Sequence, residues 1–208
     1  MLAPRNPVLW PSLLMLIALI AAAPADAENR IRLRSGGDRA DTITIDETAE
    51  PPMITVSSGV TVRGGPGTVR AVGGGKFQIL VPGNVTYHLK ARGGVDTITV
   101  VDGPGSSTYW LGAGAESDFV FVQDGPGDDR YKLEGKGGDD TYEVFDDAGD
   151  GNDYYYLKGA SGADRFGISD GAGDDTYKLR GSAEADLTFT DADGDLDVVK
   201  VKGIELEP

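Results

Sequence analysis

The chain has 208 residues, including 31 glycines, one histidine and no cysteine, and its formal net charge is −15 at pH 7. The lack of cysteine excludes a disulfide framework. The negative charge is concentrated from 96 to 208, which contains nine Lys and Arg and 27 Asp and Glu. Residues 28–95 contain nine Lys and Arg but only six Asp and Glu. This acidic half argues against nucleic acid as a partner, because nucleic-acid binding depends on basic patches. It predicts instead either disorder through self-repulsion or a bound cation.

Residues 1–27 are typical of an export signal. Arg5 precedes an eleven-residue apolar run from 13 to 23, and Ala25-Asp26-Ala27 is typical of an A-x-A cleavage site. A membrane span needs about 20 apolar residues, so we expect a cleaved signal peptide rather than an uncleaved anchor. The sequence thus predicts a protein that is secreted, periplasmic or at the cell surface, with no membrane span after signal cleavage.

Residues 28–91 predict an irregular, β-rich region. Short alternating segments favour strands at 42–45, 54–56, 60–62, 77–81 and 85–89, separated by Gly and Pro turns. We interpret the region either as degenerate coils of the repeat that follows or as a β cap that closes its basic end.

Residues 92–208 carry a repeat of eleven residues. An aspartate, or once a serine, recurs shortly before each pair of apolar residues. Successive members of this series are eleven residues apart, except that Asp153 follows Asp140 by thirteen. The series is Asp96, Ser107, Asp118, Asp129, Asp140, Asp153, Asp164, Asp175, Asp186 and Asp197. The residues two and four places after each of these are apolar, except Thr188 and Thr190. This alternation predicts one short strand per repeat, with one buried face.

The repeat predicts an all-β fold, a parallel β-roll or β-helix solenoid with two repeats, about 22 residues, in each coil. Equivalent residues of successive coils then lie about 4.8 Å apart, so that Asp118 stacks on Asp140, and Asp164 on Asp186. Carboxylates this close repel one another by roughly several kcal/mol. Ca²⁺ would neutralise them, because it accepts about six to eight oxygens from carboxylates and backbone carbonyls. We therefore expect several Ca²⁺ ions as cofactors.

Five stretches share a glycine and aspartate motif. They are DGPGDDRYK (124–132), GKGGDDTYE (135–143), AGDGNDYYY (148–156), GASGADRFG (159–167) and DGAGDDTYK (170–178). They resemble the RTX, or haemolysin-type, calcium-binding repeat G-G-x-G-x-D-x-U-x, here in an eleven-residue variant. The resemblance implies a β-roll wound around Ca²⁺. Carried over to this chain, the side-chain ligands would be Asp118, Asp129, Asp140, Asp153, Asp164 and Asp175, with carbonyls near Gly127, Gly138, Gly151, Gly162 and Gly173.

Further acidic residues extend this set of candidate metal ligands. Asp128, Asp139 and Asp174 are included because paired acids exceed what turn capping needs. The weaker candidates are Asp96, Asp186, Asp191, Asp193, Asp195 and Asp197. The last four lie in DADGDLD, which is either an extra calcium loop or a polar terminal cap. The alternative for the whole series is that the aspartates hydrogen-bond turn amides without any metal.

Several aromatic residues occupy positions that should face outwards. They are Trp110, Phe119, Phe121, Tyr154 and Tyr156. We expect the N-terminal segment to fold back over Phe119 and Phe121, and the alternative is self-association or a protein partner. Glycan binding by the aromatic residues is a further alternative. The inward-facing tyrosines predict core packing rather than a sugar platform.

These features together predict an exported, non-enzymatic protein whose acidic repeats fold or are stabilised on binding Ca²⁺. It would serve as a structural, adhesive or surface-associated module. The alternative is a β-helix polysaccharide-modifying enzyme or an accessory subunit of one. We expect no enzymatic activity, because His88 has no evident catalytic partner and no G-x-S-x-G, H-E-x-x-H or phosphate-loop motif is present.

Overall fold

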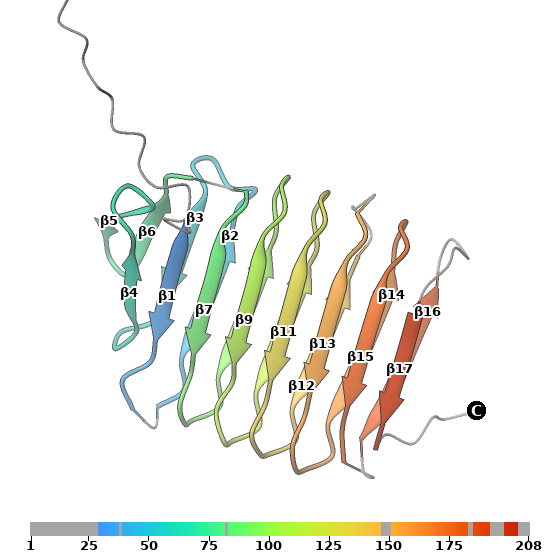
Figure 1. Ribbon diagram of the computed structural model, residues 1–208. Helices are drawn as coiled ribbons and strands as arrows, with labels where there is room; N and C mark the ends of the chain where they lie inside the picture. The colour runs from blue at the N-terminus through green and yellow to red at the C-terminus, as the bar shows by residue number, and fades with distance from the viewer. Residues whose placement is uncertain are drawn as a thin grey trace, which may run out of the picture.

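The computed structural model describes residues 29–37, 39–81, 83–146, 151–182, 185–191 and 198–203. Within these residues the fold has 17 strands and no helix, and the strands form two sheets (Figure 1). The first sheet runs, in spatial order, through β17 (Val198–Lys202), β15 (Thr176–Arg180), β13 (Tyr154–Lys158), β11 (Arg130–Glu134), β9 (Thr108–Gly112), β7 (Thr86–Lys90), β1 (Arg30–Arg34) and β4 (Thr61–Gly64). The second sheet runs through β16 (Asp186–Asp191), β14 (Arg165–Asp170), β12 (Thr141–Phe145), β10 (Phe119–Gln123), β8 (Thr97–Val101), β2 (Thr42–Asp46), β3 (Met53–Val56), β6 (Lys76–Ile79) and β5 (Val69–Gly73).

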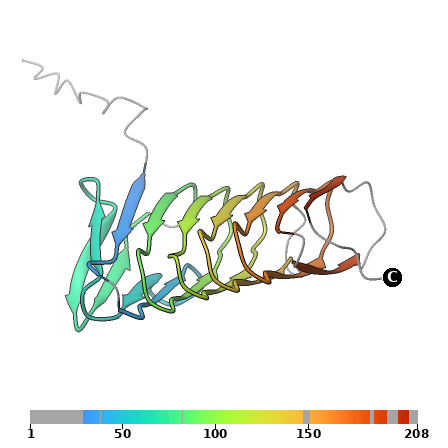
Figure 2. The same ribbon diagram turned by 90° about the horizontal axis from the view of Figure 1, so that it is seen from below.

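From β7 onwards, consecutive strands alternate between the two sheets, and each pairs in parallel with the strand two places later. Tyr109 lies opposite Tyr131, and Val120 lies opposite Tyr142, so one coil is 22 residues long at these positions. Figure 2 shows the successive coils lying one behind the other along a single axis. The prediction of an all-β parallel solenoid with two repeats in each coil is confirmed.

The core lies between the two sheets and follows the alternation of each strand. In the first sheet the inward-facing tyrosines are fully buried and stack along the solenoid axis, with the ring centroids of Tyr109 and Tyr131 only 4.9 Å apart and the rings nearly parallel. The same column continues through Tyr87, Tyr109, Tyr131, Tyr155 and Tyr177. Burying a large apolar side chain contributes about 1.5–3 kcal/mol, so this column is a major part of the core. The prediction that the inward tyrosines pack in the core is confirmed.

The N-terminal region contains both a coil and a cap. β1 and β2 continue the parallel sheets, since they pair with β7 and β8. The strands β3 to β6 instead pair antiparallel and lie at the outer edges of both sheets (Figure 1). They end the stack and so occupy edges that would otherwise expose unpaired backbone groups.

The register of β16 differs from the sequence prediction. Phe166 lies opposite Leu187 and Ile168 opposite Phe189, so Asp186 lies beside Arg165. The predicted stacking of Asp186 on Asp164 is therefore wrong by one residue, and Thr188 is exposed. A one-residue slip exchanges the two faces of a strand, and the packing of partly buried Leu187 and Phe189 against the core outweighs an unbroken acidic series.

The two outer faces differ strongly in charge. Twelve of the 19 Lys and Arg residues lie on strands of the first sheet, which carry Glu134 as their one acidic residue. We call the outer face of this sheet the basic face; its cations are Arg30, Arg32, Arg34, Arg63, Lys90, Arg130, Lys132, Lys158, Lys178, Arg180, Lys200 and Lys202. A central row follows the solenoid axis across the face, and it consists of Arg63, Arg32, His88, Trp110, Lys132, Tyr156, Lys178 and Lys200.

Among the described residues there is no helix long and apolar enough to cross a membrane. The predicted signal segment 1–27 lies outside these residues, so it stays a prediction.

Candidate metal centre

The predicted motif aspartates are buried and form two hydrogen-bonded rows. In each row one carboxylate oxygen accepts the backbone N–H of the equivalent residue in the preceding coil. Asp153 accepts from Asp129 at 2.5 Å, and Asp175 accepts from Asp153 at 2.6 Å. In the other row, Asp140 accepts from Asp118 at 3.0 Å, and Asp118 accepts from Asp96 at 2.8 Å. The side chains are therefore fixed in the turns, at the two long edges of the solenoid.

A further row of buried aspartates lies at the ends of strands in the second sheet. Asp102, Asp124, Asp146 and Asp170 directly follow or end β8, β10, β12 and β14, and all are at most 3 % exposed. These four aspartates are not among the metal ligands predicted from the sequence. A signal was present, because an acid replaces the first glycine of the nonapeptide in DGPGDDRYK and DGAGDDTYK, and it does so only on alternate repeats. Alternate repeats meet at the same edge of a two-repeat coil.

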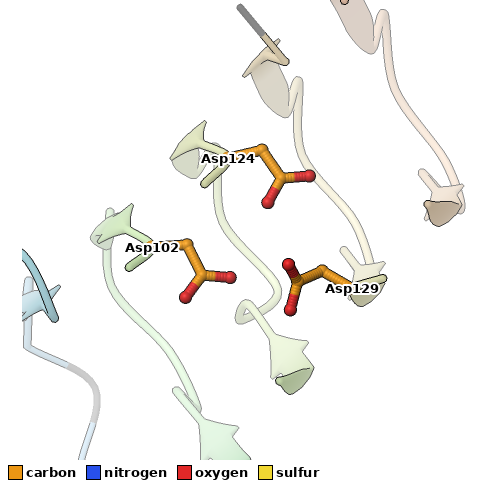
Figure 3. A group of neighbouring side chains, drawn as sticks. All are labelled: Asp102, Asp124 and Asp129. Atoms are coloured by element: carbon orange, nitrogen blue, oxygen red, sulfur yellow. The ribbon is translucent and has the colours of Figure 1, made fainter. Parts of the chain in front are cut away.

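This row and one of the motif rows come together at one edge, which we call the acidic edge. Three groups of carboxylates have oxygens within 4.8 Å of one another: Asp102 with Asp124 and Asp129, Asp124 with Asp146 and Asp153, and Asp146 with Asp170 and Asp175. Figure 3 shows the first group, in which Asp129, at the end of the turn that leads into β11, points towards Asp102 and Asp124. Neighbouring triads share a residue, so the acidic edge is a continuous series of triads close enough to hold metal ions.

Tyrosine hydroxyls from the core satisfy part of this row. Tyr131 donates to Asp102 at 2.7 Å and to Asp124 at 2.5 Å, and Tyr155 also donates to Asp124. Burial, together with the neighbouring carboxylates, raises the pKa of Tyr131 well above its usual value, so the phenol remains a donor. The tyrosine column therefore fixes the aspartate row from the core side.

Other oxygens of the triads have no hydrogen-bond partner in the part of the chain that the structure describes. They include Oδ2 of Asp129, Oδ2 of Asp153 and Oδ1 of Asp146, all in residues at most 3 % exposed. A buried carboxylate oxygen without a partner costs free energy, because it has lost its water. These oxygens are available to a ligand within the acidic edge.

Burial and mutual repulsion raise the pKa values of the triad carboxylates. Burial and the charges of Asp102 and Asp124 raise the pKa of Asp129 to about 9. Burial and the charge of Asp124 raise the pKa of Asp153 to about 9, and similar causes raise that of Asp146 to about 8. Burial raises the pKa of Asp102 to about 6, against the lowering effect of the tyrosine hydroxyls. At neutral pH the triads must therefore hold either protons or cations.

Glycines let the turns of this edge stack directly on one another. Gly127, at φ 148°, lies against the carbonyl oxygen of Gly105, and a Cβ there would be only 1.9 Å from that oxygen. The same clash would occur at 1.8 Å between Gly151 and the Gly127 oxygen, and at 1.7 Å between Gly173 and the Gly151 oxygen. The glycine positions selected from the sequence at this edge therefore have a steric role, because a side chain there would meet the backbone of the neighbouring turn.

The opposite edge, which we call the glycine edge, lacks the second row of acids. Asp140 and Asp164 are buried there, and a Cβ at Gly135 or Gly159 would lie 1.8 or 1.7 Å from the nearest carboxylate oxygen. Asp118 is satisfied by the N–H of Gly114 at 2.6 Å. Gly138 and Gly162 also belong to this edge, both with positive φ. Burial raises the pKa of Asp140 to about 7 and that of Asp96 to about 6. No metal-sized triad forms here among the described residues.

The outer members of the paired acids point away from both rows. Asp128, Asp139 and Asp174 are exposed on the turns. Asp128 accepts the N–H of Asn152 at 3.0 Å, and Asp139 accepts that of Ala163 at 2.9 Å. They bridge neighbouring turns but do not join the triads. In the weaker set, Asp191 lies opposite Asp170 in the backbone register. The side chains of Asp186 and Asp191 and the whole of Asp193, Asp195 and Asp197 lie outside the described structure.

The outward aromatic residues lie on two different faces. Trp110, Tyr154 and Tyr156 belong to the basic face, whereas Phe119 and Phe121 lie on β10 of the second sheet. Phe121 contacts Phe145 with a ring separation of 5.5 Å. The prediction that the N-terminal segment folds back over these phenylalanines is wrong. Its strands β2, β3, β6 and β5 instead continue the second sheet beyond β8, and β8 separates them from β10. The predicted aromatic surface is therefore two separate surfaces.

Comparisons of the chain with family models, with curated proteins and with solved structures found no match.

Proposed function

We propose that this protein is an exported, non-enzymatic calcium-binding β-roll, similar to RTX repeats, whose acidic edge binds several Ca²⁺ ions. The observation that carries the proposal is the series of buried triads with oxygens that lack hydrogen-bond partners. The ions would stabilise the coils, and the protein would act as a structural, adhesive or surface-associated module.

The triad oxygens are close enough together to share a Ca²⁺ ion. Ca²⁺–oxygen distances are about 2.3–2.6 Å, so oxygens on opposite sides of one ion are about 4.6–5.2 Å apart. The triad oxygens lie within 4.8 Å of one another. Mg²⁺ binds at about 2.0–2.1 Å in a strict octahedron and retains water, which suits a buried and shared set of carboxylates less well.

The charge also fits. The three triads contain seven different carboxylates, and three divalent ions would bring six positive charges to them. Near neutralisation removes the repulsion that otherwise raises the pKa of Asp129 and Asp153. The carbonyls of Gly105, Gly127 and Gly151 offer further hard oxygen ligands at the same turns.

The proposal differs from a simple transfer of the RTX motif in where it places the ions. The motif alone selects both edges equally. The described geometry favours the edge of Asp102, Asp124 and Asp146, because only there does a second row of acids face the motif aspartates.

The proposal is tested by circular dichroism and calorimetry of the purified protein in EDTA and during a CaCl₂ titration, with MgCl₂ as the control ion. We expect Ca²⁺ to induce or stabilise the β spectrum cooperatively, whereas Mg²⁺ has a much weaker effect. Calorimetry at pH 7 in two buffers of different ionisation enthalpy should show proton release, because Ca²⁺ displaces protons from carboxyl groups with raised pKa values.

Equal β spectra and equal stability in EDTA and Ca²⁺, with no heat of binding, would contradict the proposal. The triads would then be protonated hydrogen-bonding groups of the turns, as in the metal-free alternative.

A further inference from the structure

The basic face is unusual for a chain of this charge. The protein has a net charge of −15, yet the strands of the first sheet bring together twelve cationic side chains and one acidic one. The cations come from both ends of the sequence, from β1 to β17, and only the parallel stacking places them on one surface. A concentration of like charge on a folded surface attracts a partner of opposite charge.

Aromatic rings contact two cations of the central row, Lys132 and Lys178. The ammonium group of Lys132 lies 4.9 Å from the Trp110 ring and 5.8 Å from the Tyr156 ring, and that of Lys178 lies 4.7 Å from the Tyr154 ring. Lys132 also forms an ion pair at 3.2 Å with Glu134, the one acidic residue on the strands of the first sheet. Cation–π contacts restrict a lysine but leave its charge available to a ligand.

The face has the shape of a long strip. The first sheet has eight strands, and at about 4.8 Å between strands the strip is about 34 Å long. Its strands are mostly five residues long, so it is only about 15 Å wide. Shallow hollows follow it, one lined by Arg34, Lys90, Trp110 and Lys132, and another by Arg32 and Arg63. A strip of this form fits a linear polymer aligned with the solenoid axis.

The surroundings of the strip favour a single flexible chain over a flat membrane. Exposed Asp128 and Asp174 lie on the turns that border the strip at the acidic edge. A planar anionic surface would approach these acids together with the cations, whereas a chain within the strip avoids them.

The ring contacts also argue against a single-stranded nucleic acid. Such partners stack their bases on open aromatic faces. One face of Trp110 is covered by His88, with the rings 5.5 Å apart and 22° from parallel, and the other is approached by Lys132. The row therefore offers charges and ring edges rather than platforms for bases.

We propose that the basic face binds a linear acidic polysaccharide, whose carboxylate or sulfate groups contact the cations of the central row. Arg32 and Arg63 can hold such groups with two parallel hydrogen bonds, and Lys132 and Lys178 supply point charges along the same line. This binding site is separate from the acidic edge and does not depend on the proposed calcium binding.

The test uses the full chain in a buffer where circular dichroism shows the folded β spectrum, with a short, fluorescently labelled oligogalacturonate as the probe. Fluorescence anisotropy should show saturable binding that weakens as NaCl is added. The variant Arg32→Gln/Lys132→Gln/Lys178→Gln should bind about tenfold more weakly or worse. The matched control Arg70→Gln/Lys76→Gln/Arg165→Gln removes the same charge from the second sheet and should bind within about twofold of the unchanged protein. A labelled heparin fragment tests whether sulfate groups serve as well as carboxylates.

Three results would overturn the proposal: no binding of either polysaccharide, equal weakening by the two triple variants, or tighter binding of a single-stranded oligonucleotide of the same charge. If the basic-face triple variant loses its β spectrum, the single change Lys132→Gln, compared with Lys76→Gln, decides the same question.

Discussion

Replacing Asp124 by asparagine should change the stability of the protein in opposite directions with and without Ca²⁺. Asp124 belongs to two of the three triads, and it accepts the hydroxyls of Tyr131 and Tyr155. Asparagine keeps the shape and one oxygen acceptor but removes the charge. With Ca²⁺ bound, two sites lose a charged ligand, whereas without Ca²⁺ a repulsive charge disappears.

The magnitudes follow from linkage. A site occupied at 100 times its dissociation constant stabilises the folded state by about 2.7 kcal/mol, so the loss at two shared sites is up to about 5 kcal/mol. Without Ca²⁺, the charge of Asp124 contributes to the raised pKa values of Asp129 and Asp153. If the charge of Asp124 is removed, these pKa values fall, and ionising Asp129 and Asp153 at high pH destabilises the folded state less. We expect the free energy of unfolding in EDTA at pH 9 to rise by about 1–3 kcal/mol.

Urea unfolding followed by circular dichroism at pH 9, in EDTA and in excess CaCl₂, measures both effects. The matched control is Asp128→Asn, since Asp128 lies four residues away but is exposed and outside the triads. We expect the control to change the free energy of unfolding by less than about 1 kcal/mol in both conditions. If Asp124→Asn shifts stability in the same direction with and without Ca²⁺, the carboxylates of the acidic edge do not bind the ion.

Three further predictions concern the same edge. Without metal, the free energy of unfolding should fall as the pH rises from about 4 towards about 9, because the raised pKa values mean that the folded state binds protons more tightly than the unfolded state. Urea titrations in EDTA measure this, and a stability that rises with pH would refute it. Gly127→Ala should lower the free energy of unfolding in urea by about 2–4 kcal/mol, because its Cβ would lie 1.9 Å from the Gly105 oxygen. The control Gly37→Ala, whose Cβ meets no atom within 4 Å, should cost less than about 1 kcal/mol. Equal costs would show that the turns separate readily. Tyr131→Phe should cost about 1–3 kcal/mol by leaving buried acceptors on Asp102 and Asp124. It should cost more than Tyr142→Phe, whose hydroxyl donates to a single neutral acceptor, the Lys158 carbonyl, at 3.2 Å. Thermal unfolding of the two variants under the same conditions compares them, and the reverse order would contradict the role given to the tyrosine row.

The local pattern of the chain determined its secondary structure and most of its core. Apolar residues two and four places after each motif aspartate alternate too regularly for any arrangement except strands with one buried face. The glycines at the turns were readable for the same reason, since positions such as Gly127 adopt a φ that other residues rarely adopt. Both are properties of single repeats, and a sequence displays them directly.

The prediction for β16 was wrong where two local signals conflicted. The acidic series favoured Asp186 at the motif position, but the structure instead turns Leu187 and Phe189 towards the core, where they are partly buried. Packing of two large apolar side chains against the core outweighs the continuation of a polar row. Residue spacing alone does not give the relative free energies of these two effects.

The sequence by itself therefore determined that the chain forms short strands in stacked coils, with aspartates fixed in the turns, because these features depend on neighbouring residues. Only the tertiary structure decided which acids meet. Asp102 and Asp124 lie 22 residues apart, and they join Asp129 because two repeats complete one coil and bring alternate turns to the same edge. The basic face arose in the same way: its cations are dispersed from Arg30 to Lys202, and the parallel register places them on one surface.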